Sequence, residues 1–93
     1  MLFDPLLHQA VRSKLISLLI ANEELPFKAL KELLEVTDGN LSSHLKKLEK
    51  EDYVRIEKTF EGKRPKTVIH ITKVGRKAFE IYIEALKSFI EEN

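Results

Sequence analysis

Residues 38–51 carry side chains that could hydrogen-bond to the bases and phosphates of a nucleic acid. A helix turns by about 100° per residue, so Leu41, Leu45 and Leu48 share one narrow stripe of a helix over this range. The opposite side is small, polar and partly basic, and it consists of Gly39, Asn40, Ser43, Lys46 and Lys47. Such a face suits the major groove of DNA, where amides pair with base edges and ammonium groups reach phosphates. We therefore interpret this stretch as a recognition helix.

An alternative interpretation concerns the two lysines of this predicted helix. Lys46 and Lys47 could simply be solvated, since Lys47 can pair with Glu51 one turn later. The neighbouring Ser42 and Ser43 favour the nucleic-acid interpretation, because serine is a mediocre helix former. Their small hydroxyl groups would also let the helix approach DNA closely.

Asn40 is the strongest single candidate for base recognition, because its amide can pair with N6 and N7 of adenine. Thr37 predicts the N-cap of the helix, and Asp38 is favourable beside the positive helix end. His44 borders the leucine stripe. This position is equally compatible with a partly buried structural role and with a DNA contact.

A change of period after residue 52 predicts a β-hairpin with a basic tip. Apolar and polar residues alternate over 53–60 and again over 67–71, as they do in strands. The turn between them, predicted over 61–65, and the residue after it contain Gly62, Lys63, Arg64, Pro65 and Lys66. These cations could merely protect a strand edge from aggregation. A stiffened basic tip beside a polar recognition face favours phosphate binding instead.

Two helices are expected before the recognition helix. Asp4 and Pro5 predict the N-cap and first position of a helix that runs to about Ile20, with apolar residues on more than one side. A short second helix is expected from Phe27 to about Leu34, with a turn at residues 35–36. This second helix, the turn and the recognition helix together form a helix-turn-helix.

The last predicted helix, over about 73–92 and capped by Thr72, has more apolar surface than one small domain can bury. Its apolar residues span an arc of roughly 200°, about twice what a helix needs to sit on one core. A second copy of the chain is the simplest cover, so we expect a homodimer. The predicted contacts are Leu6, Ala10, Phe79, Ile83, Leu86 and Ile90. The alternative is a monomer in which the last helix packs back onto the first predicted helix of the same chain.

The composition predicts one domain over residues 1–93 and argues against several classes of function. The chain has no cysteine and a net charge of only +1. His8 and His70 lack ligand spacing and are expected to be structural or surface residues. We find no glycine-rich phosphate loop and no nucleophile with a base at a plausible spacing, so no enzyme, metal or cofactor is predicted. No apolar run reaches a membrane span and the start has no signal-peptide pattern, so a cytoplasmic protein without membrane contact is expected.

The order of elements and the sequence itself resemble the small winged helix-turn-helix transcriptional regulators related to the MarR and ArsR families. The resemblance covers roughly residues 2–86 and is carried by DPLLHQAVRSKLISLL, FKALKELLEVTDGNLSSHLKKLEKEDYV and FEGKRPKTVIHITKVGRKAF. It implies an α+β, mostly α fold with a three-helix core, a two-stranded wing hairpin and a long C-terminal helix. Two differences stand out: Asp52 replaces a glycine common before the wing, and the cysteines and histidine clusters of metal-sensing relatives are missing.

The same resemblance implies a homodimer that binds double-stranded DNA as a repressor or an activator. The recognition helix, about 38–51, would lie in the major groove, and the wing, about 60–66, on the adjacent backbone or minor groove. Residues carried over by position are Asn40, Ser43 and Lys47 near the bases, Thr37, Ser42 and Lys46 near phosphates, and Lys63 and Arg64 in the wing. Dimers of this kind bind pseudo-palindromic sites.

Two further possibilities are compatible with the sequence. A winged helix can serve as a protein-interaction module, although the predicted recognition helix exposes Ser, Asn and Lys rather than an apolar patch. A small-molecule effector could also bind between protomers and change the spacing of the recognition helices, but no motif identifies one.

Overall fold

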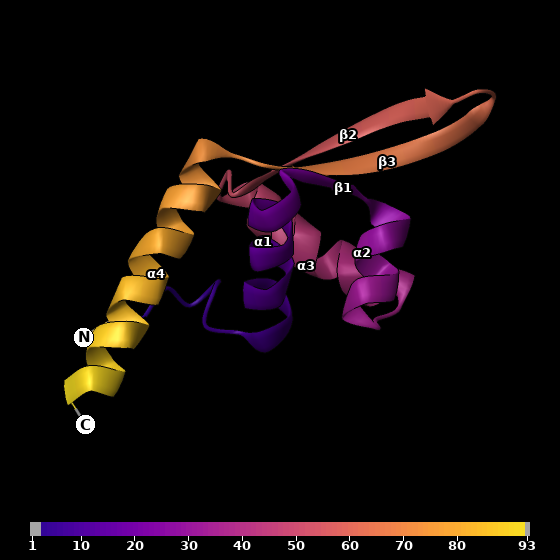
Figure 1. Ribbon diagram of the computed structural model, residues 1–93. Coiled ribbons are helices and arrows are strands. Elements are labelled where there is room, and N and C mark those ends of the chain that lie inside the picture. Colours follow the sequence, from indigo (N-terminus) through magenta and orange to yellow (C-terminus); the bar gives the residue numbers. More distant parts are fainter. Residues whose placement is uncertain (1–2, 93) are drawn as a thin grey trace.

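Residues 3–92 are described by a computed structural model, and within them four helices and three strands form one sheet-and-helix assembly. The elements are α1 (Ala10–Asn22), β1 (Glu24–Pro26), α2 (Phe27–Leu34), α3 (Asp38–Lys50), β2 (Val54–Glu61), β3 (Arg64–Ile71) and α4 (Lys73–Glu92). The sheet is antiparallel with the order β1-β3-β2. Figure 1 shows the β2-β3 hairpin and α4 projecting from opposite sides of the helical body. The mostly helical fold predicted from the sequence is confirmed.

The helices α2 and α3 form the predicted helix-turn-helix. Thr37 caps α3, because its hydroxyl oxygen accepts the backbone N–H of Asn40 at 3.1 Å. An ion pair of 2.8 Å between Lys31 and Asp38 links the two helices across the turn. The leucine stripe of α3 is buried, so its polar face points to solvent.

The hydrophobic core lies where α1, α2, α3 and the sheet meet. The side chains with no exposed surface in the described residues are Leu7, Leu15, Ile16, Leu19, Leu30, Leu41, Leu48 and Ile69. They come from every element except β1, β2 and α4. The core therefore fixes α3 against α1 and the sheet. This packing sets the direction in which the polar face of α3 points.

The start of α1 differs from the prediction. The helix begins at Ala10 rather than at Pro5, and Gln9 caps it by accepting the N–H of Arg12 at 2.8 Å. Asp4 is therefore not the N-cap of α1. Its carboxylate accepts a hydrogen bond from the hydroxyl of Tyr53, next to the end of α3. This long-range contact holds the N-terminal segment in a separate turn, and no local pattern could have predicted it.

The sheet has one strand more than predicted. Residues 24–26, which lie between the two predicted helices, form the edge strand β1, in which Leu25 lies opposite Ile69 of β3. Three residues are too few to show a period, and Pro26 argues against a strand in a sequence. Proline is tolerated here because an edge strand has one side without ladder hydrogen bonds.

The wing turn is shorter than the predicted turn over 61–65. Only Gly62 and Lys63 lie between β2 and β3. Gly62 has a φ of 65° and Lys63 has no positive φ, which is the pattern of a type II′ hairpin turn. Pro65 lies within β3, opposite Phe60. Its nitrogen faces the free edge of β3 beyond the end of β1, where no ladder partner needs an N–H.

The first turn of α4 is attached directly to the segment that follows α3. Thr72 caps α4 as predicted, because its hydroxyl oxygen accepts the N–H of Gly75 at 2.9 Å. The same hydroxyl lies 2.5 Å from the backbone oxygen of Asp52 and 3.0 Å from that of Tyr53. Gly75 is buried against the backbone of Tyr53 and leaves no room for a Cβ atom. The position of α4 is therefore coupled to the end of α3.

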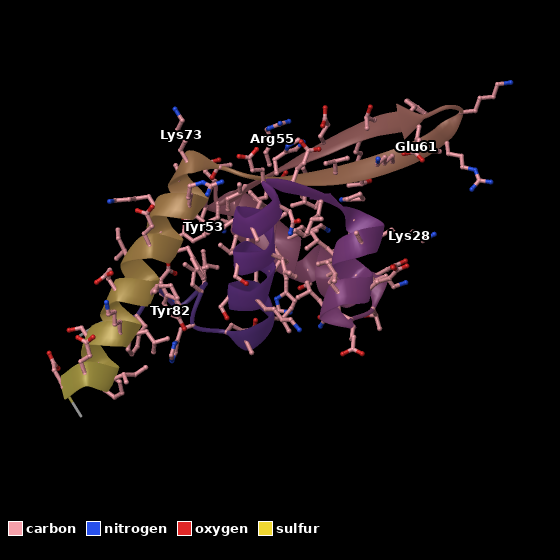
Figure 2. All side chains as sticks on the ribbon, viewed as in Figure 1. Lys28, Tyr53, Arg55, Glu61, Lys73 and Tyr82 are labelled. Carbon is pink, nitrogen blue, oxygen red and sulfur yellow. The ribbon has the colours of Figure 1, made fainter. Side chains whose placement is uncertain are left out.

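The helix α1 packs on α4 of the same chain, as well as on β3, α2 and β1. Its apolar surface on more than one side is thus used, as predicted. The Tyr82 hydroxyl lies 3.0 Å from Nδ1 of His8, whose ring stacks on Phe3 at 4.8 Å. Figure 2 shows Tyr82 on the side of α4 that faces α1. Part of the contact that was expected between protomers is therefore made within one chain.

Candidate nucleic-acid interface

The exposed face of α3 carries the polar residues singled out from the sequence. Thr37, Gly39, Asn40, Ser43, Lys46 and Lys47 are exposed, and Ser42 and His44 are half-buried at its two borders. Within residues 3–92, no carboxylate lies within 4 Å of the ammonium group of Lys46 or Lys47. The pair between Lys47 and Glu51 that the sequence allows is not formed. The face therefore offers an amide, hydroxyls and two uncompensated cations to solvent.

His44 is held by Arg12, a residue that the sequence did not single out. Nη1 of Arg12 lies 3.1 Å from Nδ1 of His44, and Nε of Arg12 donates to the carbonyl oxygen of Leu6 at 2.6 Å. A guanidinium group only donates, so Nδ1 must accept and the proton of the neutral ring is on Nε2. Burial, and then the positive charges of Arg12 and Lys47, lower the pKa of His44. This border of the α3 face therefore combines a neutral imidazole with a fixed guanidinium group.

We expect the free energy of unfolding to decrease as the pH falls below about 6.5, the ordinary pKa of histidine. The lowered pKa of His44 means that the unfolded chain binds this proton more tightly than the folded chain. Its contribution to stability is therefore complete above the unfolded pKa and is lost as the pH falls toward the folded pKa. His44→Gln can still accept from Arg12 and should reduce this pH dependence. Thermal unfolding of both proteins across this range measures it, and equal pH dependence in the two would contradict it.

A groove of about 670 Å³ separates α3 from the hairpin. Ser42, Lys46 and Glu49 line its α3 side, and Lys58 and Thr67 line its hairpin side. The polar part of the lining thus has two ammonium groups and two hydroxyls against one carboxylate, which favours an anion, while Phe27, Leu45 and Ile56 add apolar surface. Lys58 and Thr67 were absent from the predicted residues. The two-residue period of each strand places Lys58 and Thr67 on the face of the hairpin that also carries most of its apolar residues. Only the fold brings that face opposite α3.

The cations of the wing have different surroundings. Lys63 and Arg64 are exposed, and no carboxylate of residues 3–92 lies within 4 Å of either. Lys66 is half-buried, and its ammonium group binds Glu61 at 3.0 Å. A second hollow, of about 580 Å³, lies between the start of α2 and this part of β3. Lys28 also lines it, and Figure 2 shows this side chain projecting from α2 below the hairpin.

The structure divides the residues predicted to form a dimer into two groups. Leu6, Phe79 and Leu86 are half-buried, and Phe79 and Leu86 pack against the core. Ala10 is exposed at the first position of α1. These four residues have at most part of their surface left for a partner.

The other two, Ile83 and Ile90, are 41% and 64% exposed. They line a shallow apolar depression of about 340 Å³ on α4, together with Leu86. Val74 and Ile81 are also exposed, on the other flank of α4, and were not among the predicted contacts. They belong to the same apolar arc, and only the fold shows that they remain uncovered by their own chain.

Two titratable groups away from the α3 face, His70 and Tyr53, form contacts within the chain. His70 lies between Glu24 and Glu57 across the three strands, with nitrogen to oxygen distances of 3.7 and 2.9 Å. Burial and the hydrogen bond to Asp4 raise the pKa of Tyr53 to about 12. Residues 3–92 contain no cluster of three side chains that could hold a metal ion. In the same range, no helix is long and apolar enough to cross a bilayer.

Known proteins with related sequences decide the family. The family model described as a winged helix DNA-binding domain matches residues 11–90. The chain belongs to this family. An uncharacterized protein of Methanocaldococcus jannaschii is 47% identical to this winged helix domain over 76 residues, which make up 82% of this chain and 83% of that protein.

Solved structures share the winged helix fold. A transcriptional regulator homologue from Pyrococcus horikoshii OT3 has a TM-score of 0.88 and 31% identity, over 94% of this chain and 86% of that chain. A transcriptional regulator of the MarR family from Silicibacter pomeroyi has a TM-score of 0.70 and 22% identity, over 89% of this chain and 55% of that chain. The fold predicted from the resemblance to these regulators is confirmed.

The aspartate that replaces a common glycine before the wing does not alter the turn of this winged helix domain. Asp52 has a φ of 61°, the left-handed conformation that glycine adopts freely. Its N–H donates to the carbonyl of Glu49, and the N–H of Tyr53 donates to that of Leu48, both at 2.9 Å. These are the two bonds of a Schellman motif, so α3 ends as it would with glycine.

Proposed function

We propose that this winged helix domain is a transcriptional regulator that binds double-stranded DNA sequence-specifically as a homodimer. The observation that carries the proposal is the exposed polar face of α3. Its lysines have no carboxylate partner within residues 3–92, and further cations lie along both of its borders. Lys46 and Lys58 line the groove toward the wing, and Arg12 lies at the opposite border beside His44. Membership of a DNA-binding family supports DNA as the ligand.

The groove between α3 and the wing suits one strand of the DNA backbone. A helix in the major groove and a hairpin at the adjacent minor groove have one sugar-phosphate strand between them. Lys46, Lys58, Ser42 and Thr67 line the space that this strand would occupy. Asn40 and Ser43 would then face base edges, while Lys63 and Arg64 reach phosphates at the wing. This assignment extends the predicted contacts by Lys58, Thr67 and Arg12.

The exposed apolar residues of α4 support the homodimer. Ile83 and Ile90 border an apolar depression, and Val74 and Ile81 are uncovered on the other flank. The apolar residues of α4 extend beyond its contact with the core, so a further partner is needed to cover them. A second copy of the chain supplies an identical face. Such a dimer would present two α3 helices to half-sites about 34 Å apart on a pseudo-palindromic operator.

The salt dependence of DNA binding tests the assignment. Lys47→Ala and Arg64→Ala should weaken binding to all duplexes, and each should reduce the slope of log K against log salt by about one. Asn40→Ala should instead relax preference at one base position, with a loss of about 1–3 kcal/mol on the preferred site. Titrations of a selected operator and a scrambled duplex at several salt concentrations give both quantities. Affinity that does not change with salt would contradict the proposal.

The competing function is a protein-interaction module, and two exposed apolar side chains favour it. Phe60 on the wing and Leu33 on α2 are both exposed. This module would show no retardation of any duplex at low salt. The same experiment therefore decides between the two functions.

A signal molecule and a cellular location complete the proposal. The depression beside Ile83 and Ile90 would lie between the two protomers, where an apolar effector could bind and change the spacing of the α3 helices. A regulator that acts on chromosomal DNA would work in the cytoplasm. A ligand screen by thermal shift, followed by DNA titration of each hit, tests the effector; hits that never alter DNA affinity would count against it.

A further inference from the structure

Phe60 is the most exposed large apolar side chain of the described residues, with 70% of its surface accessible. It lies near the tip of the wing, opposite Pro65 in the strand register and two residues before the loop that carries Lys63. A ring with so much accessible surface contributes little to the core of its own chain, and Phe60 does not belong to the core cluster. The ring is therefore a candidate for contact with a partner.

The register places Phe60 on the inner face of the hairpin. Side chains alternate along a strand, so Val54, Ile56, Lys58 and Phe60 share one face of β2. Val54 is buried in the core, Ile56 packs against it, and Lys58 lines the groove opposite α3. Phe60 comes next along this row, one step farther from α3 than the groove.

This order fits the layout of B-DNA. If α3 lies in the major groove and a backbone strand lies in the groove beside Lys58, the next feature along the duplex is the minor groove. The inner face of the wing tip would then meet the minor groove through Phe60 and Pro65. A whole hairpin is too wide for a groove of about 6 Å, but one aromatic side chain can enter it.

We propose that Phe60 inserts its ring into the minor groove beside each half-site and partially unstacks a flexible pyrimidine-purine step. This inference rests on the proposed function and adds a second, indirect source of sequence preference. Apolar side chains that enter the minor groove wedge between base steps and kink the duplex. Steps such as TA and CA are the easiest to kink, so the protein would prefer them next to the bases that α3 contacts.

The charges around Phe60 favour DNA over a protein partner. Lys58 lies two residues before Phe60 on the same face of β2, Lys63 lies in the turn and Arg64 begins β3, and none of the three has a carboxylate within 4 Å in residues 3–92. Lys66 on the opposite strand is paired with Glu61. An aromatic ring among uncompensated cations matches a polyanion with apolar sugar and base surfaces.

The test combines affinity with a probe of base stacking. Wild-type protein, Phe60→Ala, Phe60→Leu and Lys63→Ala are titrated onto duplexes that carry 2-aminopurine at a TA step or a GG step beside the half-site. The wild type should raise 2-aminopurine fluorescence at the TA step and prefer that duplex by roughly tenfold. Phe60→Ala should lose both effects with an unchanged salt slope, and Phe60→Leu should keep most of them. Lys63→Ala should lower the salt slope by about one and keep the step preference.

The outcomes separate this inference from the proposed function. If the wild type binds DNA and Phe60→Ala binds with the same affinity and step preference, the wedge is wrong and the regulator stands. If the wild type binds no duplex, both fail. Loss of binding to another protein on Phe60→Ala, without any change in DNA binding, would also overturn the wedge. Thermal unfolding of the variants checks that substitution at these exposed positions has not altered the fold.

Discussion

Replacement of both Ile83 and Ile90 by glutamate is expected to give a folded monomer that binds its operator at least about 100-fold more weakly than the wild type. Two linked DNA-binding units gain roughly 10²–10⁴ in affinity over one, because the second contact is intramolecular. Separation of the protomers removes this gain without touching α3. Sedimentation equilibrium measures the mass, and titration of a two-half-site duplex measures the loss of affinity.

The physical reason is the cost of burying charge in an apolar contact. Ile83 and Ile90 are both exposed in the single chain, so glutamate at either position can reach water in a monomer. In a dimer the same carboxylates would lose water without a partner, which costs several kcal/mol. The folded monomer is therefore favoured, and its thermal unfolding should show an intact domain.

Ile81→Glu provides a matched control on the same helix. Ile81 is 60% exposed and lies two residues before Ile83, about 200° away around α4. If the interface is formed by the Ile83 flank, this variant remains a dimer. A monomer from Ile81→Glu and a dimer from the double variant would instead assign the interface to the Val74 flank. Dimers from all three proteins would contradict the proposed role of α4.

Gly75→Ala is expected to destabilise the domain by about 3 kcal/mol or more, although it adds a single methyl group. A Cβ atom at this position would lie 2.1 Å from the backbone oxygen of Tyr53. That oxygen is fixed, since it accepts hydrogen bonds from the N–H of Thr72 at 3.3 Å and from its hydroxyl at 3.0 Å. Neither backbone can move away without breaking the junction between α3 and α4.

Gly39→Ala is the matched control, because a Cβ atom at Gly39 meets no heavy atom within 4 Å. Alanine in a helix is up to about 1 kcal/mol more favourable than glycine, so this variant should be slightly more stable than the wild type. Chemical denaturation of the three proteins compares their free energies of unfolding. A Gly75→Ala protein as stable as Gly39→Ala would show that α4 is not held against Tyr53.

Much of this fold follows from patterns that are local in the sequence. The leucine stripe of α3, its N-cap at Thr37, the two-residue period of β2 and β3 and the cap of α4 at Thr72 were all predicted, and the structure confirms them. A helix or strand with one buried face must repeat its apolar residues with its own period. That requirement makes such elements visible in a single sequence.

The polar residues of α3 and the cations at the wing tip were found for the same reason. Leu41, Leu45 and Leu48 define the buried side of α3, and the polar residues opposite them favour solvent. Asn40, Ser43 and Lys47 lie on that opposite side, and the structure confirms that they are exposed. Their role toward DNA stays a prediction that the variants above can test.

The features of the fold that were not predicted from the sequence depend on contacts between distant segments. Arg12 reaches His44 across 32 positions, and Asp4 reaches Tyr53 across 49 instead of capping α1, which begins only at Ala10. β1 exists only because β3 supplies its hydrogen-bond partners. No spacing rule covers such contacts, because they depend on the angles at which whole elements pack.

The sequence by itself determined the helix-turn-helix, the wing and the amphipathic last helix, since each follows from the periodicity of its own residues. Only the tertiary structure decided which faces meet: Lys58 and Thr67 across a groove from α3, Gly75 against Tyr53, and Phe60 uncovered beyond them. The physical reason is that burial is a property of pairs of elements, whereas a period is a property of one.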